Sequence, residues 1–182
     1  KTNGQNVFSY FNLDQVFTQG IEFNQFWKWN DHFSLKGGYQ LLYAKDKEAL
    51  KAFQQGNVFA RKSAGAPAVR LDKNDYFGLL NRSRHMANLK FTYTNPIKNL
   101  TANIRVTYRS RYGLFDNNDN SYLDQFDRFV SGYTLWDFAA NKLWNKHLRM
   151  GIGIDNLFNF TDPVNISNIP GRIYYGKLTL KL

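Results

Sequence analysis

The feature that most constrains the fold of this chain is a long run of strict alternation over residues 100–112. From Leu100 to Tyr112, the even positions carry mainly apolar or aromatic side chains, and the odd positions carry polar or basic ones. A period of two is typical of a β-strand whose two faces meet different surroundings. The run is about twice as long as a usual globular strand and matches the roughly 9–11 residues that a tilted strand needs to cross a bilayer. The pattern therefore favours a membrane-spanning strand.

The same alternation recurs along the chain and predicts an all-β fold of about eight strands and no helix. The other alternating segments cover residues 6–12, 16–29, 33–43, 87–94, 133–144, 148–155 and 174–182. Short connections with turn residues lie at 30–31, 95–98 and 145–146, and long ones cover 48–81, 116–132 and 160–171. Antiparallel strands with short turns at one end and long loops at the other are the arrangement of a transmembrane up-and-down β-barrel in a bacterial outer membrane.

Composition narrows the classes of protein that remain. The chain has 182 residues, with 16 Phe, 11 Tyr and 4 Trp, no Cys and a net charge of +10. Its aromatic content excludes a disordered chain, and the absence of Cys excludes a disulfide scaffold and thiol chemistry. No apolar run approaches the ~18 residues of a membrane-spanning helix. An outer-membrane barrel with aromatic girdles and a soluble nucleic-acid-binding β domain both combine polarity with many aromatics, and the strand lengths favour the barrel, so we expect no nucleic-acid partner.

Three groups of residues resemble motifs of a known family. Near the end, Asn156-Leu157-Phe158-Asn159 precedes Pro170-Gly171-Arg172; upstream, Gly20-Ile21-Glu22 follows Asn12; between them lies the segment 82–88, from Arg82 to Asn88. These segments resemble strand starts and ends in TonB-dependent outer-membrane receptors of the Bacteroidetes type. Their order and spacing extend the resemblance over the whole chain. Members usually end in an aromatic residue, whereas this chain ends in Leu182.

The resemblance implies that residues 1–182 are the C-terminal third of a barrel of about 22 strands. The plug domain and the N-terminal barrel strands would lie outside this sequence. The receptor would actively import a scarce nutrient, which the sequence leaves open among ferric siderophore, haem, cobalamin and oligosaccharide. The implied partners are the outer-membrane lipid, the plug, the nutrient ligand, and the TonB energy-coupling protein through the missing N-terminal part.

A self-contained eight-stranded barrel, with a structural or adhesive role, stays open as an alternative. The expected inward face bears on this choice, because it is rich in basic residues and poor in carboxylates. The basic residues are Lys36, Lys90, Arg105, Arg109, Arg111, Arg149, Lys177 and Lys181. Unpaired charge inside a narrow sealed barrel is costly, so the imbalance favours a wide, wet lumen or acidic groups on a plug.

Candidate binding residues follow from the expected faces. Arg105, Arg109 and Arg111 share one face, and we expect them to line the lumen and to contact an anionic ligand or acidic plug residues. The long loop 48–81 contributes Tyr76 and Phe77, whose rings suit a planar ligand, although packing over the barrel mouth explains them equally.

Arg84 and His85 lie where a late strand begins and complete the set of candidate ligand contacts. His85 is a candidate ligand for a haem or metal chelate, but a single exposed histidine is commonly only a polar surface residue.

No spacing of His, Ser and acidic residues predicts catalysis, and we expect neither an enzyme nor a cofactor. The only metal motif is weak. Asp116, Asn118, Asn120 and Asp127 stand at calcium-loop positions, but Ser121 replaces the glycine that such a loop requires. A solvated polar loop explains the segment equally well.

Overall fold

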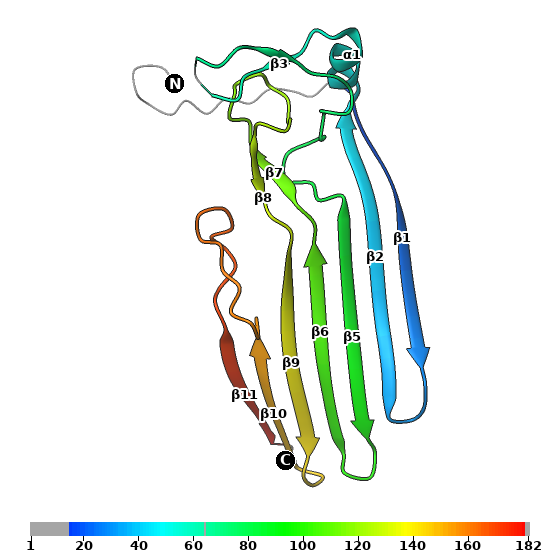
Figure 1. Ribbon diagram of the computed structural model, residues 1–182. Coiled ribbons are helices and arrows are strands. Elements are labelled where there is room, and N and C mark those ends of the chain that lie inside the picture. The colour runs from blue at the N-terminus through cyan, green and yellow to red at the C-terminus, as the bar shows by residue number, and fades with distance from the viewer. Residues whose placement is uncertain (1–14, 64, 181–182) are drawn as a thin grey trace.

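The computed structural model describes residues 15–63 and 65–180, and these form one large antiparallel sheet below a set of loops (Figure 1). The seven strands of the sheet, in spatial order, are β1 (Val16–Lys28), β2 (Phe33–Asp46), β5 (His85–Asn95), β6 (Leu100–Arg109), β9 (Tyr133–Leu143), β10 (Leu148–Asp155) and β11 (Ile173–Leu180). This order confirms the up-and-down topology. The strand expected at 6–12 lies outside the described residues. Within them, β1 and β11 are the two edges and the sheet is open.

Short turns join strand pairs at one end of the sheet, and asparagine side chains shape them. Asn30, Asn95 and Asn145 each accept, through Oδ1, a hydrogen bond from the backbone N–H three residues later, at 2.9, 3.0 and 2.8 Å. This side-chain bond mimics a backbone turn and explains why asparagine marks these positions. The long connections 47–84, 110–132 and 156–172 all lie at the opposite end (Figure 1). The predicted alternation of short and long connections is confirmed.

The strand register sorts the side chains onto two faces, because residues paired across neighbouring strands point the same way. One row across four strands is polar and contains Lys36, Lys90, Arg105 and Asp137. The row beside it is apolar and contains Leu35, Phe91, Ile104 and Phe138. We call these sides the polar face and the apolar face of the sheet.

The apolar face is uncovered. Ile21, Ile152 and Leu178 on this face are 68%, 63% and 61% exposed, and no other part of the described chain packs on them. Apolar surface in water costs roughly 25 cal/mol per Å², so a continuous face of this kind requires an apolar environment. A lipid bilayer supplies that environment for an antiparallel sheet of long strands.

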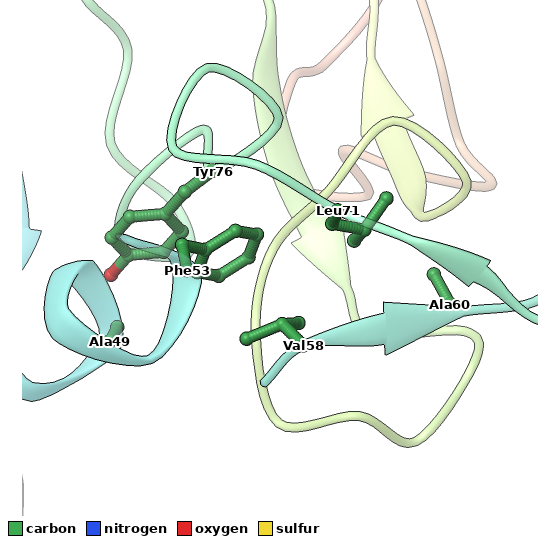
Figure 2. Close-up of a cluster of buried hydrophobic side chains, with 6 residues drawn as sticks. All are labelled: Ala49, Phe53, Val58, Ala60, Leu71 and Tyr76. Atoms are coloured by element: carbon green, nitrogen blue, oxygen red, sulfur yellow. The ribbon is translucent and has the colours of Figure 1, made fainter. Parts of the chain in front are cut away.

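Buried apolar residues gather instead in the long connections, which we call the loop cap (residues 47–84, 110–132 and 156–172). Figure 2 shows the larger cluster, with Ala49, Phe53, Val58, Ala60, Leu71 and Tyr76. A second cluster contains Tyr112, Val130 and Ile166. Two short hairpins support the clusters: β3 (Phe59–Ala60) with β4 (Val69–Arg70), and β7 (Tyr112–Phe115) with β8 (Arg128–Val130).

The prediction that the chain has no helix is wrong, because α1 (Lys47–Gln55) follows β2 in the loop cap. Asp46 caps its start by accepting a hydrogen bond from Glu48 N at 2.8 Å, and Gly56 ends it in the left-handed conformation at φ 69°. Ala49 and Phe53, four residues apart, bury one side of this helix. Among the described residues, no helix has the length and apolar character needed to cross a membrane.

The expected strand 100–112 is also too long. β6 ends at Arg109, and a hydrogen bond from Ser110 N to the His85 carbonyl, 2.9 Å long, closes the β5–β6 pairing there. The chain then enters the loop cap, where Tyr112 is buried against Val130 instead of continuing the apolar face. The alternation predicts a longer strand because it continues past Arg109 into the residues that lead to β7.

Candidate functional site

A cleft of about 460 Å³ lies where the loop cap meets the upper ends of β5 and β6. Its walls contain Asn74, Asp75, Phe77, Arg84, His85, Ser110, Arg111, Asp124, Gln125 and Phe129. We call it the rim cleft. Four candidate binding residues from the sequence, Phe77, Arg84, His85 and Arg111, meet here although they come from three segments of the chain. The structure does not test their roles, but it brings them together.

Cations and aromatic rings alternate along one wall of the rim cleft. The Arg84 guanidinium carbon lies 4.4 Å from the centre of the Phe77 ring, and that of Arg111 lies 4.2 Å from Phe129. The two rings meet edge to face with centres 4.9 Å apart. Guanidinium groups stack on rings in this way while keeping their in-plane N–H donors free. The arrangement holds two cations close together.

Neither guanidinium of the rim cleft forms an ion pair within the described residues, whose salt bridges are Lys28–Asp31, Lys51–Glu48 and Arg105–Asp137. Arg84 donates from Nη2 to the Phe77 carbonyl at 2.9 Å, whereas its Nε is buried and has no hydrogen-bond partner. A buried donor without an acceptor costs about 1–3 kcal/mol, so the Arg84 guanidinium is incompletely satisfied in this position.

Two carboxylates also line the rim cleft, and both are held by their own loops. Asp124 is fully buried and accepts hydrogen bonds from the side-chain amides of Asn118 and Asn120, at 3.0 and 2.8 Å. Asp75 accepts from the backbone N–H of Asp72 at 2.8 Å. These bonds shape the loops and leave the two guanidinium groups without a contacting counter-ion.

His85 and Ser110 line the rim cleft directly beyond Met86–Arg109, the last pair of β5 and β6. The backbone N–H of His85 donates to Ser110 Oγ at 3.0 Å, and His85 Nδ1 is hydrogen-bonded to the Tyr39 hydroxyl at 2.7 Å. Alternation along β5 places His85 on the apolar face with Leu89. His85 therefore places one side of the cleft next to the apolar face.

The arginines expected to share one face have three different environments. Arg111 follows the end of β6 and lies in the rim cleft. Arg105 lies on the polar face, where Nε and Nη2 both donate to Asp137 Oδ2 at 3.0 and 2.8 Å. The other oxygen of Asp137 accepts from Asn156 N at 3.0 Å, so this pair fastens the loop after β10 to the sheet.

Arg109 lies on the polar face at the end of β6 and connects the sheet to the loop cap. Its Nε donates to Ser83 Oγ at 2.8 Å, its Nη2 donates to the Asn81 carbonyl at 3.0 Å, and its guanidinium carbon lies 3.8 Å from the Tyr112 ring centre. It also borders a groove of about 350 Å³, whose other polar-face residues include Gln40, Met86, Asn88, Thr107 and Tyr133. Arg109 can thus anchor a loop and meet solute in the barrel interior.

Tyr76 belongs to the core of the loop cap. It is buried and stacks on Phe53 with ring centres 5.1 Å apart (Figure 2). Its hydroxyl accepts a hydrogen bond from Asp46 N at 3.2 Å. Burial raises the pKa of its hydroxyl above the ordinary value of 10.0, which keeps the ring neutral. In this position it supports the base of α1.

The loop that carries the calcium-like spacing is closed by its own hydrogen bonds. Asp116 accepts from the backbone N–H groups of Asn118 and Ser121, and Asp127 accepts from those of Asn117 and Asp124. Among the described residues, no group of three or more His, Cys, Asp or Glu side chains is arranged to hold a metal ion. The oxygens therefore act here as loop-shaping acceptors.

The sequence analysis did not single out the other six residues of the rim cleft, which are Asn74, Asp75, Ser110, Asp124, Gln125 and Phe129. Ser110 lies inside the strand expected over residues 100–112, and Phe129 lies in the long connection expected over 116–132. The one signal available in the sequence was Phe129, an aromatic residue four positions before the expected strand 133–144.

The open sheet with one apolar and one polar face defines a wall segment of an outer-membrane β-barrel. The family described as "TonB dependent receptor-like, beta-barrel" matches residues 1–157. The chain therefore belongs to the TonB-dependent receptor family, whose members are transporters in the bacterial outer membrane. This membership argues against the nucleic-acid-binding alternative.

Solved structures of receptors share the fold. A variant of the ferric enterobactin receptor from Pseudomonas aeruginosa, in complex with enterobactin, matches with a TM-score of 0.61 and 17% identity over 93% of this chain and 23% of that one. A siderophore receptor from Acinetobacter baumannii matches with a TM-score of 0.53 and 17% identity over 80% of this chain and 18% of that one. The ferric yersiniabactin uptake receptor from Yersinia pestis matches with a TM-score of 0.50 and 10% identity over 89% and 22%.

The chain thus spans less than a quarter of the length of these solved receptors. No protein with a curated description matches it in a sequence comparison.

Proposed function

We propose that this chain supplies part of the barrel wall, late extracellular loops and lumen lining of a receptor that actively imports a scarce nutrient. The rest of the receptor, including the plug domain and the N-terminal strands, would complete the barrel. Energy would reach it from the inner membrane through the TonB energy-coupling protein. Family membership and the length of the solved relatives support this proposal.

The observation that carries the proposal is the basic row on the polar face. Lys36, Lys90 and Arg105 are cross-strand neighbours, and of these three only Arg105 forms a salt bridge with a carboxylate of the described residues. Like charges side by side destabilise a sheet unless water or counter-charges surround them. A wide lumen filled by water and an acidic plug surface would provide both.

Ferric siderophores are the ligand class to test first, because the solved relatives named above are described as siderophore receptors. Haem, cobalamin and oligosaccharides are the other classes for comparison. Arg109 is the residue of this chain that we assign to the ligand path, since it borders the groove on the polar face near the loop cap.

The test is uptake by cells that carry the full receptor, cells that lack it, and cells that lack TonB, each supplied with one labelled ligand class at a time. We expect uptake of one class to require both proteins. Uptake that persists without TonB would show passive passage and contradict the proposal. In the full receptor, Arg109→Gln should lower uptake, and the matched substitution Arg61→Gln, at an exposed loop position, should not.

A further inference from the structure

We propose that the rim cleft binds the phosphate-bearing headgroup of an outer-leaflet lipid. This inference goes beyond the proposed function, because it concerns the outer wall of the barrel and not the transported ligand. It requires only that the apolar face meets lipid and that the long loops lie outside the cell, as in outer-membrane barrels generally.

The position of the cleft at the lipid boundary is the first argument. His85, which lines the cleft, lies on the apolar face together with Tyr39, to which it is hydrogen-bonded. Leu89, four residues further along β5, lies on the same face. The Arg84 guanidinium carbon lies 5.7 Å from the ring centre of Tyr43, which belongs to the same face of β2. Tyrosines and basic groups at the end of an apolar face are typical of the level at which lipid headgroups lie.

The charge of the cleft is the second argument. Arg84 and Arg111 approach the same Phe77 ring, at 4.4 and 5.5 Å, and neither forms an ion pair within the described residues. Guanidinium groups bind phosphate through paired, charge-assisted hydrogen bonds, and basic pockets at membrane surfaces bind lipid headgroups.

The unsatisfied donor is the third argument, and it is independent of the charge. Arg84 Nε is buried without an acceptor, although the neighbouring Nη2 is satisfied by the Phe77 carbonyl. Because Nε is buried, a phosphate oxygen in the cleft would bond to it only after the Arg84 side chain shifts toward the cleft. The two carboxylates of the cleft, Asp75 and Asp124, do not act as this acceptor, because they accept hydrogen bonds from their own loops.

The experiment uses the full-length receptor, purified in detergent and stripped of lipid. Native mass spectrometry compares its binding of bisphosphorylated lipid A with its binding of the same lipid after removal of both phosphates. We expect the wild-type receptor to prefer the phosphorylated lipid by about tenfold or more. In the double variant Arg84→Gln, Arg111→Gln, this preference should disappear.

The matched control is the double variant Arg61→Gln, Lys62→Gln, which removes the same charge from exposed positions of the connection that carries Arg84. It should keep the preference. Equal binding of the two lipids by the wild-type receptor would overturn the proposal, and that comparison needs no variant to fold. Equal losses in both double variants would also overturn it, since they would show general attraction by net charge.

An arm with inorganic phosphate distinguishes the source of the anion. Displacement of the lipid by inorganic phosphate at comparable concentration would assign the cleft to a soluble anion and overturn the lipid proposal. Nutrient uptake does not enter this measurement, so its outcome is separate from that of the proposed function.

Discussion

The sheet and the loop cap use apolar side chains in opposite ways. In the loop cap, Phe53, Leu71 and Val130 are almost completely buried against other parts of the chain. In the sheet, side chains of the same kind, such as Ile152 and Leu178, are exposed along one face. The cap is therefore folded like a small water-soluble protein, whereas the sheet is folded for a barrel wall with lipid on one side. One chain thus contains a region suited to water and a region suited to lipid.

The largest expected effect lies in the loop cap. Phe53→Ala removes a ring that packs on Tyr76 and Tyr122, and the resulting cavity should cost about 3–5 kcal/mol of the local stability of the cap. Hydrogen exchange over residues 47–77 of the full receptor measures this loss. Phe59→Ala, at an exposed position of the same cap, is the control. If the cap is a separate unit as described, the sheet amides should keep their protection in both variants.

The next effect tests the two faces of β6. Ile104→Arg places a charge on the apolar face near the middle of the strand and should cost ~2–4 kcal/mol if that face meets lipid. Thr107→Arg, on the polar face, should cost little. Reversible denaturant unfolding of the receptor in lipid vesicles compares the two variants. Equal penalties would contradict the assignment of the faces.

A third expected effect is a pH dependence of stability in the loop cap that the sheet does not share. Burial raises the pKa of Asp127 to about 6 from the ordinary 3.8, and the nearby carboxylates of Asp124 and Asp116 add to the shift. Between these two values the folded loop binds more protons than the unfolded loop, so its stability is complete at low pH and falls as the pH rises through about 6.

Hydrogen exchange over residues 116–127, corrected for the intrinsic effect of pH, measures this change. We expect a loss on the order of 1 kcal/mol from about pH 5 to about pH 7.5. Asp127→Asn should remove the dependence, and the amides of β6 should show none in either protein. A loop whose stability rises over this range would contradict the sign of the shift.

The smallest effect concerns the exposed ion pair on the polar face. The Arg105 side chain is 58% exposed, so Arg105→Gln should cost only about 0.2–1 kcal/mol. Asp137→Ala should cost more, because Asp137 is mostly buried and also accepts from Asn156 N. Denaturant unfolding of the receptor measures the free energy of unfolding of the two variants and shows which loses more. The reverse order would show that the bond to Asn156 contributes nothing.

The strands of the sheet were predictable because alternation is local. The expected segment 148–155 coincides with β10, and the faces assigned from the sequence agree with the register. The loop cap was not predictable in this way. α1 is nine residues long and rich in Lys and Gln, and its burial in the cap cluster with Val58 and Tyr76 stabilises it.

The rim cleft could be predicted only in part for the same reason. Arg84 and His85 were recognised from a local motif, but their meeting with Arg111 depends on the pairing of β5 with β6 and on the turn at Ser110. That turn is fixed by a hydrogen bond to His85, which is 25 residues away in the chain. No local pattern contains such a contact.

The central claim is that one face of the sheet meets lipid and the other meets the barrel interior. The most direct test is a series of single cysteine substitutions at residues 103–108 in a full receptor freed of other cysteines, since this chain contains none. A spin label is attached at each position, and its accessibility is measured to two relaxation agents. Oxygen concentrates in lipid, and the second agent is soluble only in water. The account predicts a period of two, with 104, 106 and 108 accessible from lipid and 103, 105 and 107 accessible from water or shielded by the plug. The opposite phase, or lipid accessibility without alternation, would contradict it.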